Sequence, residues 1–275
     1  IISDYSGQEQ IVLANRALDS NLLAFYDNGL ADMHSFVASK MYPQLEGLTL
    51  DEIKDNHKDK RQHAKAAGFA INYGGQGITI ADNIGVSLEE GNKIYDAYFT
   101  AFPGLRTYFD KVKQQGLRDG YVLINTITKR KSFIPYFEEY KELEATMNKA
   151  FWDRYRAAKA AGSSEYPDLK ERVSSYFKKK GDIERKTLNF PIQGTSAEIT
   201  KISCVYIFDY ILQNNLFGIV KFVNTIHDEN VLECPIEMQD TISDMVEDCM
   251  KRAGEIFCKR VPLKALPELS TFWKK

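Results

Sequence analysis

The segments with the pattern of β-strands lie at the two ends of this chain, and helical patterns fill most of the sequence between them. Residues 1–5 form a short run typical of a buried strand. Residues 219–224 and 230–234 are β-branched and apolar and flank an acidic turn at 225–229, which predicts two antiparallel strands. The sequence therefore predicts strands near both ends of the chain and a mainly helical region between them.

Helix signals mark several starts within the central part. Ser87 precedes Glu89 and Glu90, which predicts a capped helix, and Pro103 predicts the first turn of the next one. Residues 138–180 are rich in Lys, Glu, Ala and Tyr and are broken near Gly162, so they predict two surface helices. The other expected elements are a hairpin within 116–133, a long helix at about 182–213, a helix at about 238–257, and a strand with a tail at 261–273.

The overall charge gives no support for a nucleic-acid partner, because 36 Lys and Arg oppose 38 Asp and Glu for a net charge of -2. Any basic surface must therefore be local. No apolar run approaches the ~18 residues that cross a bilayer, and no export signal opens the chain, so we expect a soluble protein that is not exported.

The cysteines show neither a CxxC pair nor a His at zinc-ligand spacing, which predicts buried free thiols and a reducing compartment. They are Cys204, Cys234, Cys249 and Cys258.

Two acidic clusters lie far apart in the sequence but at the ends of expected strands: Asp4, and Asp228 with Glu229. Carboxylates held on strand ends can bind Mg²⁺, which prefers oxygen ligands and keeps positions open for phosphates. The alternative is that these residues are acidic groups solvated in turns.

Arg61, Lys65, Phe69 and Tyr73 follow one another at intervals of four and end at Gly74, where a helix can stop. On one helix face, the two cations can hold a triphosphate while the two rings pack on a base and a sugar. The alternative is an exposed cation pair that leads into two core aromatics.

Three segments together resemble motifs A, B and C of the DNA polymerase I family, in the order of that family. They are Asp4-Tyr-Ser-Gly-Gln-Glu9, the row from Arg61 to Gly74, and His227-Asp228-Glu229. Asp32-Met-His34 and the segment from Glu184 to Gly194 also fit the family, so the resemblance spans essentially the whole chain.

The resemblance implies an α+β right-hand polymerase fold that lacks a thumb, in which an antiparallel palm sheet formed by both ends of the chain encloses a mainly helical fingers domain. Residues 1–11 would belong to the palm, 12–180 to the fingers with a helical insertion at about 137–180, and 181–275 to the palm. The implied function is template-directed DNA synthesis in replication or repair, in which deoxynucleoside triphosphates are added to a primer 3′ end and pyrophosphate is released. Two Mg²⁺ ions, for which Mn²⁺ can substitute, would serve as cofactors.

For catalysis, the resemblance identifies Asp4 and Asp228 as the metal-bridging aspartates, with the backbone carbonyl of Tyr5 as an added ligand. Glu229 resembles the less essential acidic neighbour, and Lys65 the proton donor to pyrophosphate.

For the nucleotide, Arg61, Lys65 and His34 resemble triphosphate contacts. Phe69 resembles the ring against the incoming sugar, and it predicts discrimination against dideoxynucleotides. Tyr73 resembles the aromatic that holds the place of the templating base until the fingers close.

Glu9 resembles the steric gate against a ribose 2′-hydroxyl. Arg185, Asn189 and Gln193 lie at i, i+4 and i+8 and resemble the residues that contact DNA at the primer terminus, where His227 is also expected. Without the flanking motifs, the three helical residues would equally be an ordinary polar face.

The sequence departs from the family in three places. Gly7 replaces the usual Gln, the segment at 137–180 is longer than its bacterial counterpart, and the chain begins three residues before Asp4. We therefore expect a fragment or a split polymerase whose thumb and exonuclease belong to an N-terminal segment or a separate chain. The basic runs 129–131 and 178–180 are either DNA contacts or solvated faces.

The expected partners are primer-template DNA and deoxynucleoside triphosphates, with no membrane, in the cytoplasm of a bacterial cell or a phage-infected host. An RNA polymerase relative is disfavoured by Glu9, and a metal-dependent nuclease by the helix from Arg61 to Tyr73. A non-catalytic DNA-binding or assembly fragment, which would need an N-terminal partner, is the remaining alternative.

Overall fold

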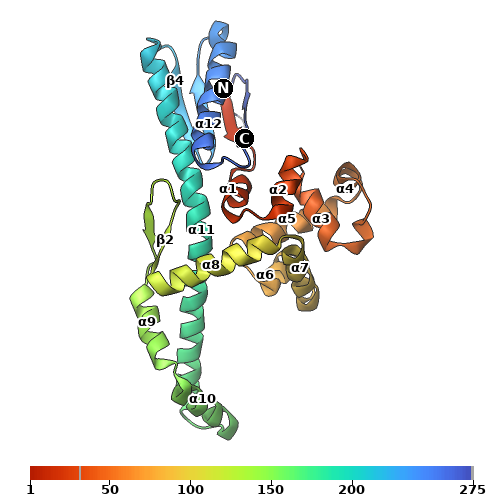
Figure 1. Cartoon of the computed structure of the whole chain (residues 1–275), viewed down its shortest axis with the longest axis vertical. Coiled ribbons are helices and arrows are strands. Elements are labelled where there is room, and N and C mark those ends of the chain that lie inside the picture. Colours follow the sequence, from red (N-terminus) through yellow and green to blue (C-terminus); the bar gives the residue numbers. More distant parts are fainter. Residues whose placement is uncertain (31, 274–275) are drawn as a thin grey trace.

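The computed structural model describes residues 1–30 and 32–273. Both ends of the chain meet in one antiparallel sheet with the strand order β4-β5-β1-β6 (Figure 1). Its strands are β1 (Ile2–Tyr5), β4 (Lys221–Ile226), β5 (Glu229–Glu233) and β6 (Ala265–Glu268). The predicted α+β fold, with a sheet formed by the two ends around a helical domain, is confirmed.

One face of the sheet is covered by the long helix α11 (Tyr166–Gln213) and by α12 (Gln239–Phe257). Alternate residues of a strand point to opposite faces. Ser3 and Tyr5 of β1 are fully buried, and the Tyr5 hydroxyl donates a 2.7 Å hydrogen bond to the main-chain oxygen of Met250 on α12. Asp4 is therefore turned to the opposite, open face.

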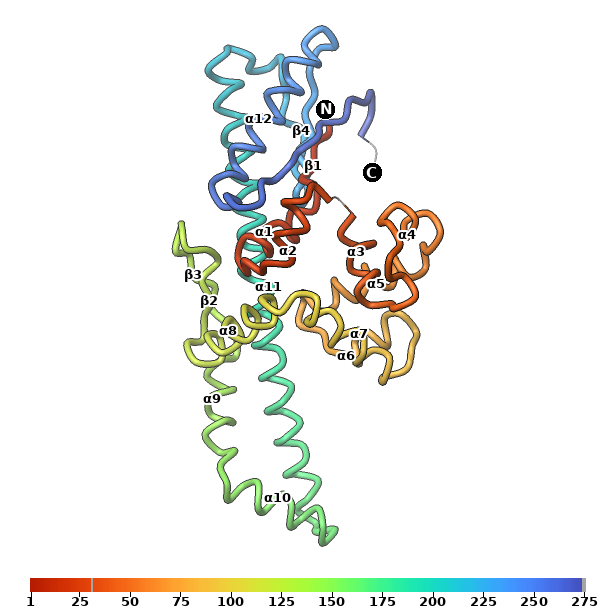
Figure 2. The backbone as a smooth tube through the Cα atoms, turned by 45° about the vertical axis from the view of Figure 1, so that its right-hand side comes forward, coloured from red at the N-terminus to blue at the C-terminus, as the bar shows by residue number. Residues whose placement is uncertain are grey.

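The helical domain leaves the sheet through α1 (Gln8–Ala17) and returns to it through α11 (Figure 2). Its further elements are α2 (Ser20–Asp27), α3 (Met33–Met41), a 3-10 turn (Pro43–Leu45), α4 (Leu50–Asn56), α5 (Lys58–Asn72), α6 (Gly77–Ile84), α7 (Leu88–Ala101) and α8 (Pro103–Asp119). One continuous apolar core joins these helices to α11, α12 and the sheet. The domain and the sheet are therefore packed as one body.

Local signals fix several of these helix ends. The hydroxyl of Ser87 accepts a 3.2 Å hydrogen bond from the Glu90 amide, and Pro103 lies in the first turn of α8, so both predicted starts are confirmed. Asp19 caps α2 and also accepts a hydrogen bond from the Gly104 amide at 2.6 Å. One carboxylate thus ties together the starts of two helices that are distant in sequence.

A hairpin and an arm extend from the helical domain. The hairpin consists of β2 (Tyr121–Leu123) and β3 (Lys131–Phe133), and two helices follow it, α9 (Phe137–Thr146) and α10 (Lys149–Ala161). The helices α9 and α10, together with residues 166–180 of α11, form a projection that we call the arm (Figure 2). Two small apolar clusters hold the arm together, centred on Tyr140 and on Phe151.

Three predicted boundaries are wrong. The long helix begins at Tyr166 and runs through Gly181, because strong helix formers surround this glycine and Ile183 is buried against the cluster around Tyr140. Residues 116–119 belong to α8, since the first residue after it, Gly120, ends the helix with a φ of 70°. The turn between β4 and β5 is limited to His227 and Asp228, with a φ of 55° at His227.

The four thiols are free, as predicted, but only Cys249 and Cys258 are buried; Cys204 and Cys234 are partly exposed. Among the described residues, every helix is either too short or too polar to cross a bilayer.

Candidate active site

The acidic residues of the two chain ends meet on the open face of the sheet. Strand pairing sets Asp4 opposite Glu229, and Asp228 occupies the turn immediately before β5. Partial burial raises the pKa of Asp228, as do the charges of Asp4 and Glu229, while its own backbone amide and His227 act in the opposite direction. Three carboxylates that are distant in sequence therefore form one negative patch.

The acidic patch offers only some of the ligands that a shared cation would need. Within residues 1–30 and 32–273, no group of three or more His, Cys, Asp or Glu side chains has the arrangement of a metal site. Asp4 and Asp228 offer two carboxylates, while the Tyr5 phenol is held against α12, so this residue can offer only its main-chain carbonyl. Such a donor set suits Mg²⁺ that completes its coordination with water and substrate phosphates.

Glu229 has a partner that the sequence patterns did not indicate. Its carboxylate accepts a 2.8 Å hydrogen bond from the indole Nε1 of Trp273, near the end of the described chain. This bond restrains Glu229, whereas the Asp4 side chain beside it remains exposed.

The row predicted from its spacing lies on α5. Arg61, Lys65 and Phe69 are within the helix, and Tyr73 follows its last residue. The Phe69 and Tyr73 rings stack with centroids 6.5 Å apart and planes 7° apart. Gly74, with a φ of 83°, ends the helix at the predicted position. Phe69 is 41% exposed, so the row is not a core stripe.

His34 joins this row from the start of α3. Its ring centroid lies 6.3 Å from that of Phe69. Burial lowers the pKa of His34, and the nearby charges of Arg61 and Lys65 lower it further, against a smaller opposite effect of Asp32. The three basic residues that the sequence analysis assigned to a triphosphate are therefore neighbours.

Asp32 organises this basic group, and the sequence analysis gave it no role of its own. Its carboxylate receives hydrogen bonds from Nε and Nη2 of Arg61 at 2.9 and 3.1 Å. It also caps α3, since it accepts from the Ser35 amide and hydroxyl at 3.1 and 2.7 Å. Burial opposes its charged form, but these hydrogen bonds prevail and lower the pKa of Asp32 to about 2. The signal was present, because Asp directly before a helix is a favoured N-cap.

Glu9, Tyr73 and Gln193 meet where α1, α5 and α11 converge. The Tyr73 hydroxyl donates a short hydrogen bond to the Glu9 carboxylate. Burial raises the pKa of Tyr73 to about 12, the contact with Glu9 adds to the shift, and a hydrogen bond with Gln193 reduces it. The structure therefore brings together three residues that were singled out separately.

Gln8, next to Glu9, anchors α1 to α11. Its side chain is buried, and Nε2 lies 3.3 Å from the Ser196 main-chain oxygen and 3.4 Å from the Thr200 hydroxyl. This polar anchor fixes the start of the helix that carries Glu9.

The three expected DNA contacts on α11 differ in their surroundings. Arg185 is exposed and forms an ion pair with Asp182, and Gln193 is exposed near Tyr73. The Oδ1 atom of Asn189 is buried without a hydrogen-bond partner among the described residues. His227 is exposed in the turn between β4 and β5, on a different element from the other three.

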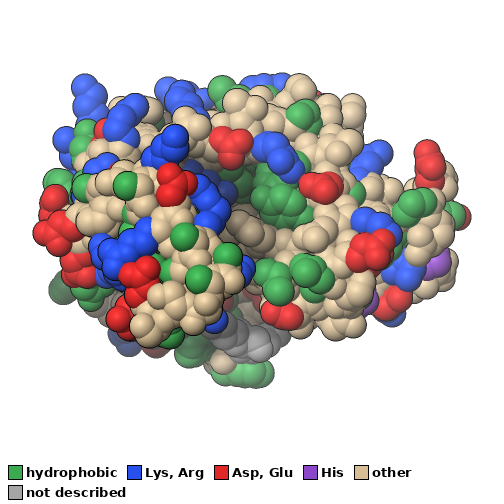
Figure 3. Space-filling model, turned by 90° about the horizontal axis from the view of Figure 1, so that it is seen from below, with side chains coloured by type: hydrophobic (Ala, Val, Ile, Leu, Met, Phe, Trp, Pro, Cys, Tyr) green, Lys and Arg blue, Asp and Glu red, His purple; other side chains and the backbone are tan. Residues whose placement is uncertain are grey.

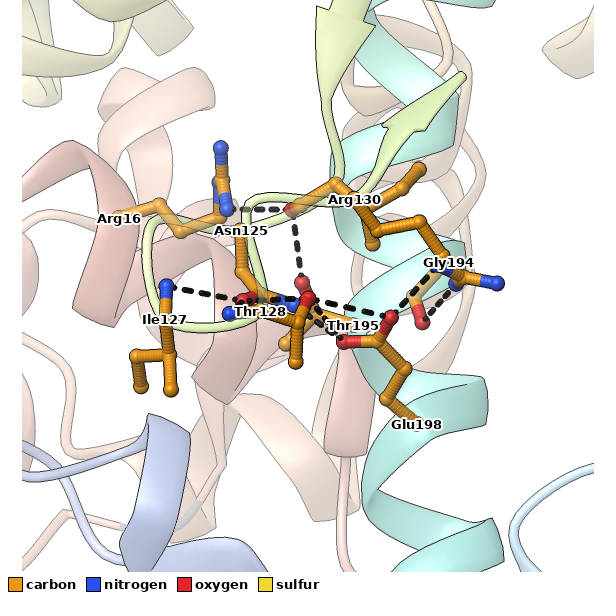
Figure 4. A network of polar contacts seen from close by, with 9 residues as sticks. Arg16, Asn125, Ile127, Thr128, Arg130, Gly194, Thr195 and Glu198 are labelled. Atoms are coloured by element: carbon orange, nitrogen blue, oxygen red, sulfur yellow. Dashed lines mark hydrogen bonds and ion pairs between the residues drawn. The ribbon is translucent and has the colours of Figure 1, made fainter.

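A polar network that sequence patterns did not indicate fixes the loop of the β2–β3 hairpin on α11 (Figure 4). Asn125 Oδ1 accepts hydrogen bonds from the amides of Ile127 and Thr128 at 3.0 and 2.8 Å, and the Asn125 amide group donates to Glu198. Arg130 Nε lies 2.6 Å from the same Glu198 carboxylate. This carboxylate therefore ties both sides of the loop to the helix.

Two further contacts secure the loop at Ile124. Its main-chain oxygen accepts from Nη1 of Arg16 at 2.7 Å and from the Thr195 hydroxyl at 2.9 Å (Figure 4). The hairpin is thus connected to α1 and α11 within two residues of Gln193.

Known polymerases resemble this chain in sequence and in its arrangement of a small antiparallel sheet and a helical domain. The family model for DNA polymerase family A matches residues 1–275. DNA polymerase I of Streptococcus pneumoniae strain R6 is 29% identical over 254 residues, which are 90% of this chain and 24% of that protein. DNA polymerase I of Aquifex aeolicus is 27% identical over 282 residues, covering 100% of this chain and 39% of its own length.

Among solved structures, the polymerase domain of Pol1 from M. smegmatis, in complex with DNA primer-template and dNTP, matches with a TM-score of 0.71. It is 24% identical, and the match covers 96% of this chain and 38% of that chain. The chain belongs to DNA polymerase family A, which confirms the resemblance. The chain spans only about a quarter of the length of the DNA polymerases I of Streptococcus pneumoniae and Lactococcus lactis.

Proposed function

We propose that this chain carries the polymerisation site of a DNA-directed DNA polymerase. In the proposed reaction, the primer 3′-oxygen bonds to the α-phosphorus of a deoxynucleoside triphosphate, the bond to the bridging oxygen breaks, and pyrophosphate leaves. The observation that carries the proposal is the strand register that sets Asp4 opposite Glu229 and beside Asp228 on the open face of the sheet.

Asp4, Asp228 and the Tyr5 carbonyl would hold two Mg²⁺ ions, or Mn²⁺ in their place. When bound, such ions lower the pKa of the primer hydroxyl and neutralise charge on the phosphates. The Asp4 side chain is exposed, as a metal ligand in this role needs to be. Asp228 lies in a turn where partial burial, with the charges of Asp4 and Glu229, disfavours its ionised form. Glu229, held by Trp273, would adjust this site without being a constant ligand.

The basic group on α3 and α5 would hold the triphosphate. Arg61 and Lys65 offer charged donors, and Lys65 would donate a proton to the departing pyrophosphate. His34 lies against Phe69, so a nucleotide on this face would contact charge at one end and a ring at the other. Arg61 would exchange part of its contact with Asp32 for a phosphate.

The contact between Tyr73 and Glu9 would control the sugar and the template. Before a nucleotide binds, the Tyr73 hydroxyl holds the Glu9 carboxylate, which would act as the gate against a ribose 2′-hydroxyl once the nucleotide is bound. Tyr73 would leave this contact when a templating base takes its place, which makes closure of the helical domain a test of pairing. The neighbouring polar face of α11 and His227 would contact the primer-template duplex.

The segments that this chain lacks relative to its family would come from the rest of a full-length protein or from a separate N-terminal chain. A groove of about 570 Å³ offers a surface on which such a segment could pack. It is lined on the open side of the sheet by apolar residues that include Val223, Ile236 and Phe272, and these three are 57%, 77% and 65% exposed. We propose that the thumb-bearing segment covers this groove.

Primer extension with Mg²⁺ and all four deoxynucleotides tests the proposed function. The chain alone, the full-length protein, and the full-length protein with Asp228→Ala should be compared. We expect extension by the full-length protein that disappears with Asp228→Ala. If the full-length protein binds primer-template DNA but does not extend it, the chain is a non-catalytic DNA-binding fragment.

A further inference from the structure

A basic pocket that lies outside motifs A, B and C is found where the arm joins the rest of the molecule. The pocket has a volume of about 310 Å³ and lies between the start of α9 and α11. Tyr136 lines it together with Lys178, Lys179 and Lys186. Seen from below, Lys and Arg gather on the left of the molecule, which is the side of the arm in Figure 1, beside a hollow (Figure 3).

Tyr136 is presented in an unusual way for a large aromatic residue. Its side chain is 67% exposed, and its φ of 61° lies in the left-handed region that a non-glycine residue seldom adopts. The ammonium groups of Lys179 and Lys186 lie 5.6 and 5.9 Å from the ring centroid. An exposed ring on a strained backbone therefore has two cations close to it.

The three lysines differ in whether they have an acidic partner. Lys179 forms an ion pair with Glu139, and the other acid of the pocket, Asp182, is paired with Arg185. Lys178 and Lys186 form no ion pair with any residue in the described ranges 1–30 and 32–273. The pocket thus has uncompensated positive charge beside an exposed ring, which matches a phosphate backbone with a base that can stack.

The pocket continues the surface of α11 that faces the candidate active site. Lys178, Asp182 and Lys186 follow one another at intervals of four, just as Arg185, Asn189 and Gln193 do. With 3.6 residues per turn, the two rows lie within about a quarter turn of each other on one side of the helix. Lys186 is roughly 10 Å along the helix axis from Gln193, at a rise of about 1.5 Å per residue.

We propose that this pocket binds the unpaired template strand, with a base stacked on Tyr136 and phosphates held by Lys178 and Lys186. This inference rests on the proposed function, in which Tyr73 holds the place of the templating base and Gln193 contacts the primer-template duplex. The proposed duplex contacts on α11, at residues 185–193, lie toward the acidic sheet, whereas the pocket residues 175–186 continue the same helix toward the arm. An exposed ring stacks on an unpaired base, while the bases of a duplex are already stacked on each other.

Binding of primer-templates that differ only in the length of the 5′ template overhang tests the proposal. Fluorescence anisotropy would give Kd for the full-length protein with overhangs of about 2 and about 12 nucleotides, lengths below and within the range of single-strand sites. The Kd for the short overhang divided by the Kd for the long overhang isolates the contribution of the unpaired strand. The wild-type protein should bind the longer overhang more tightly.

We expect Tyr136→Ala to reduce this ratio about fivefold to tenfold, as the loss of one base stack would, and Tyr136→Phe to restore it. The double variant Lys178→Glu/Lys186→Glu should reduce the ratio and also lower its dependence on salt. Lys149→Glu/Lys159→Glu on α10 makes the same charge change away from the pocket, and it should leave the ratio unchanged.

Three results would overturn the proposal: a wild-type ratio of one, an equal loss for both overhangs in the pocket variants, or the same loss of ratio in the α10 control. If Tyr136→Ala fails to fold, the lysine pair and Tyr136→Phe still give the answer. The proposed function fails separately, through extension of a short-overhang substrate that survives Asp228→Ala.

Discussion

The acidic end of the sheet and the arm are both attached to α11, but very different amounts of buried structure hold them. The sheet shares one continuous core with α11, α12 and the helical domain, and Ser3, Tyr5 and Asn230 beside the acidic residues are almost completely buried. The arm relies on two clusters with three buried residues each. Groups that must keep a fixed geometry thus lie on the best-supported part of the molecule.

The difference also separates two kinds of recognition. The acidic patch needs carboxylates fixed relative to one another, because charge on a reacting phosphate is stabilised best by groups that are already in position. A pocket that binds a flexible strand by charge and stacking tolerates more movement. We therefore expect substitutions at the sheet to affect chemistry, and those at the arm to affect stability locally and DNA binding.

The largest expected effect comes from Asp4→Asn, which keeps the size of the side chain but removes a charge from the acidic patch. We expect kcat for primer extension in the full-length protein to fall at least ~10³-fold, comparable to the loss of one well-placed electrostatic group in other enzymes. Asp209→Asn on α11 is the matched control. A loss of less than tenfold at Asp4 would remove the distinction between the sheet and the arm.

A stability comparison sharpens the contrast. Ile199→Ala removes a side chain with no exposed surface from the main core and should lower the free energy of unfolding by ~2–5 kcal/mol. Leu169→Ala in the arm should instead increase amide hydrogen exchange within α9, α10 and the start of α11, with a smaller effect on global unfolding by urea. Equal losses of global stability would show that the arm unfolds together with the core.

A smaller effect is expected at Asp32, which positions Arg61 and caps α3. Asp32→Asn weakens two charge-assisted hydrogen bonds worth ~1–3 kcal/mol in all, so KM for deoxynucleotides should rise about tenfold with a smaller change in kcat. Asp51→Asn, in an exposed first turn of α4, is the control. An equal fall in kcat with unchanged KM would contradict a role in nucleotide binding.

The depressed pKa of Asp32 also predicts a pH dependence. A carboxyl whose pKa is about 2 in the folded protein, below its unfolded value, stabilises the fold above the unfolded pKa. This contribution should decline as the pH falls through the unfolded value toward about 2. In NMR spectra, the chemical shift of the Asp32 carboxyl carbon should accordingly still be that of the ionised form at pH 4.

The smallest expected change is at Phe69, where Phe69→Tyr adds one hydroxyl to an exposed ring. One new hydrogen bond of ~0.5–1.5 kcal/mol should improve incorporation of dideoxynucleotides relative to deoxynucleotides by up to about tenfold. Phe177→Tyr in the arm makes the same change and should leave this ratio unaltered. An unchanged ratio in Phe69→Tyr would place the incoming sugar elsewhere.

Local sequence signals predicted the features that depend only on nearby residues, such as a helix face or a turn. The interval of four residues from Arg61 to Tyr73 corresponds to one helix face, and the acidic turn at Asp228 lies between two strands, as expected. The helix face and the turn need no knowledge of a distant partner. Strand patterns were recognised at both chain ends, but their union in one sheet was implied by the family resemblance, since β1 pairs with strands more than 220 residues away.

The missed features all depend on distant contacts. Nothing near Gly181 indicates that the helix continues through it, since the support comes from packing against Tyr140. The contacts of Glu229 with Trp273 and of Asn125 with Glu198 join residues 44 and 73 positions apart. Such pairs have no signature in spacing, so they became visible only when the chain was folded.

If the two ends of the chain form one cation site, both ends must contribute to the binding of Mn²⁺. Electron paramagnetic resonance can count the Mn²⁺ bound by the full-length protein with primer-template DNA and a non-hydrolysable nucleotide. We predict that Asp4→Asn and Asp228→Asn each weaken the same binding step at least tenfold, whereas Asp209→Asn does not. Unchanged Mn²⁺ binding in both variants would contradict the account.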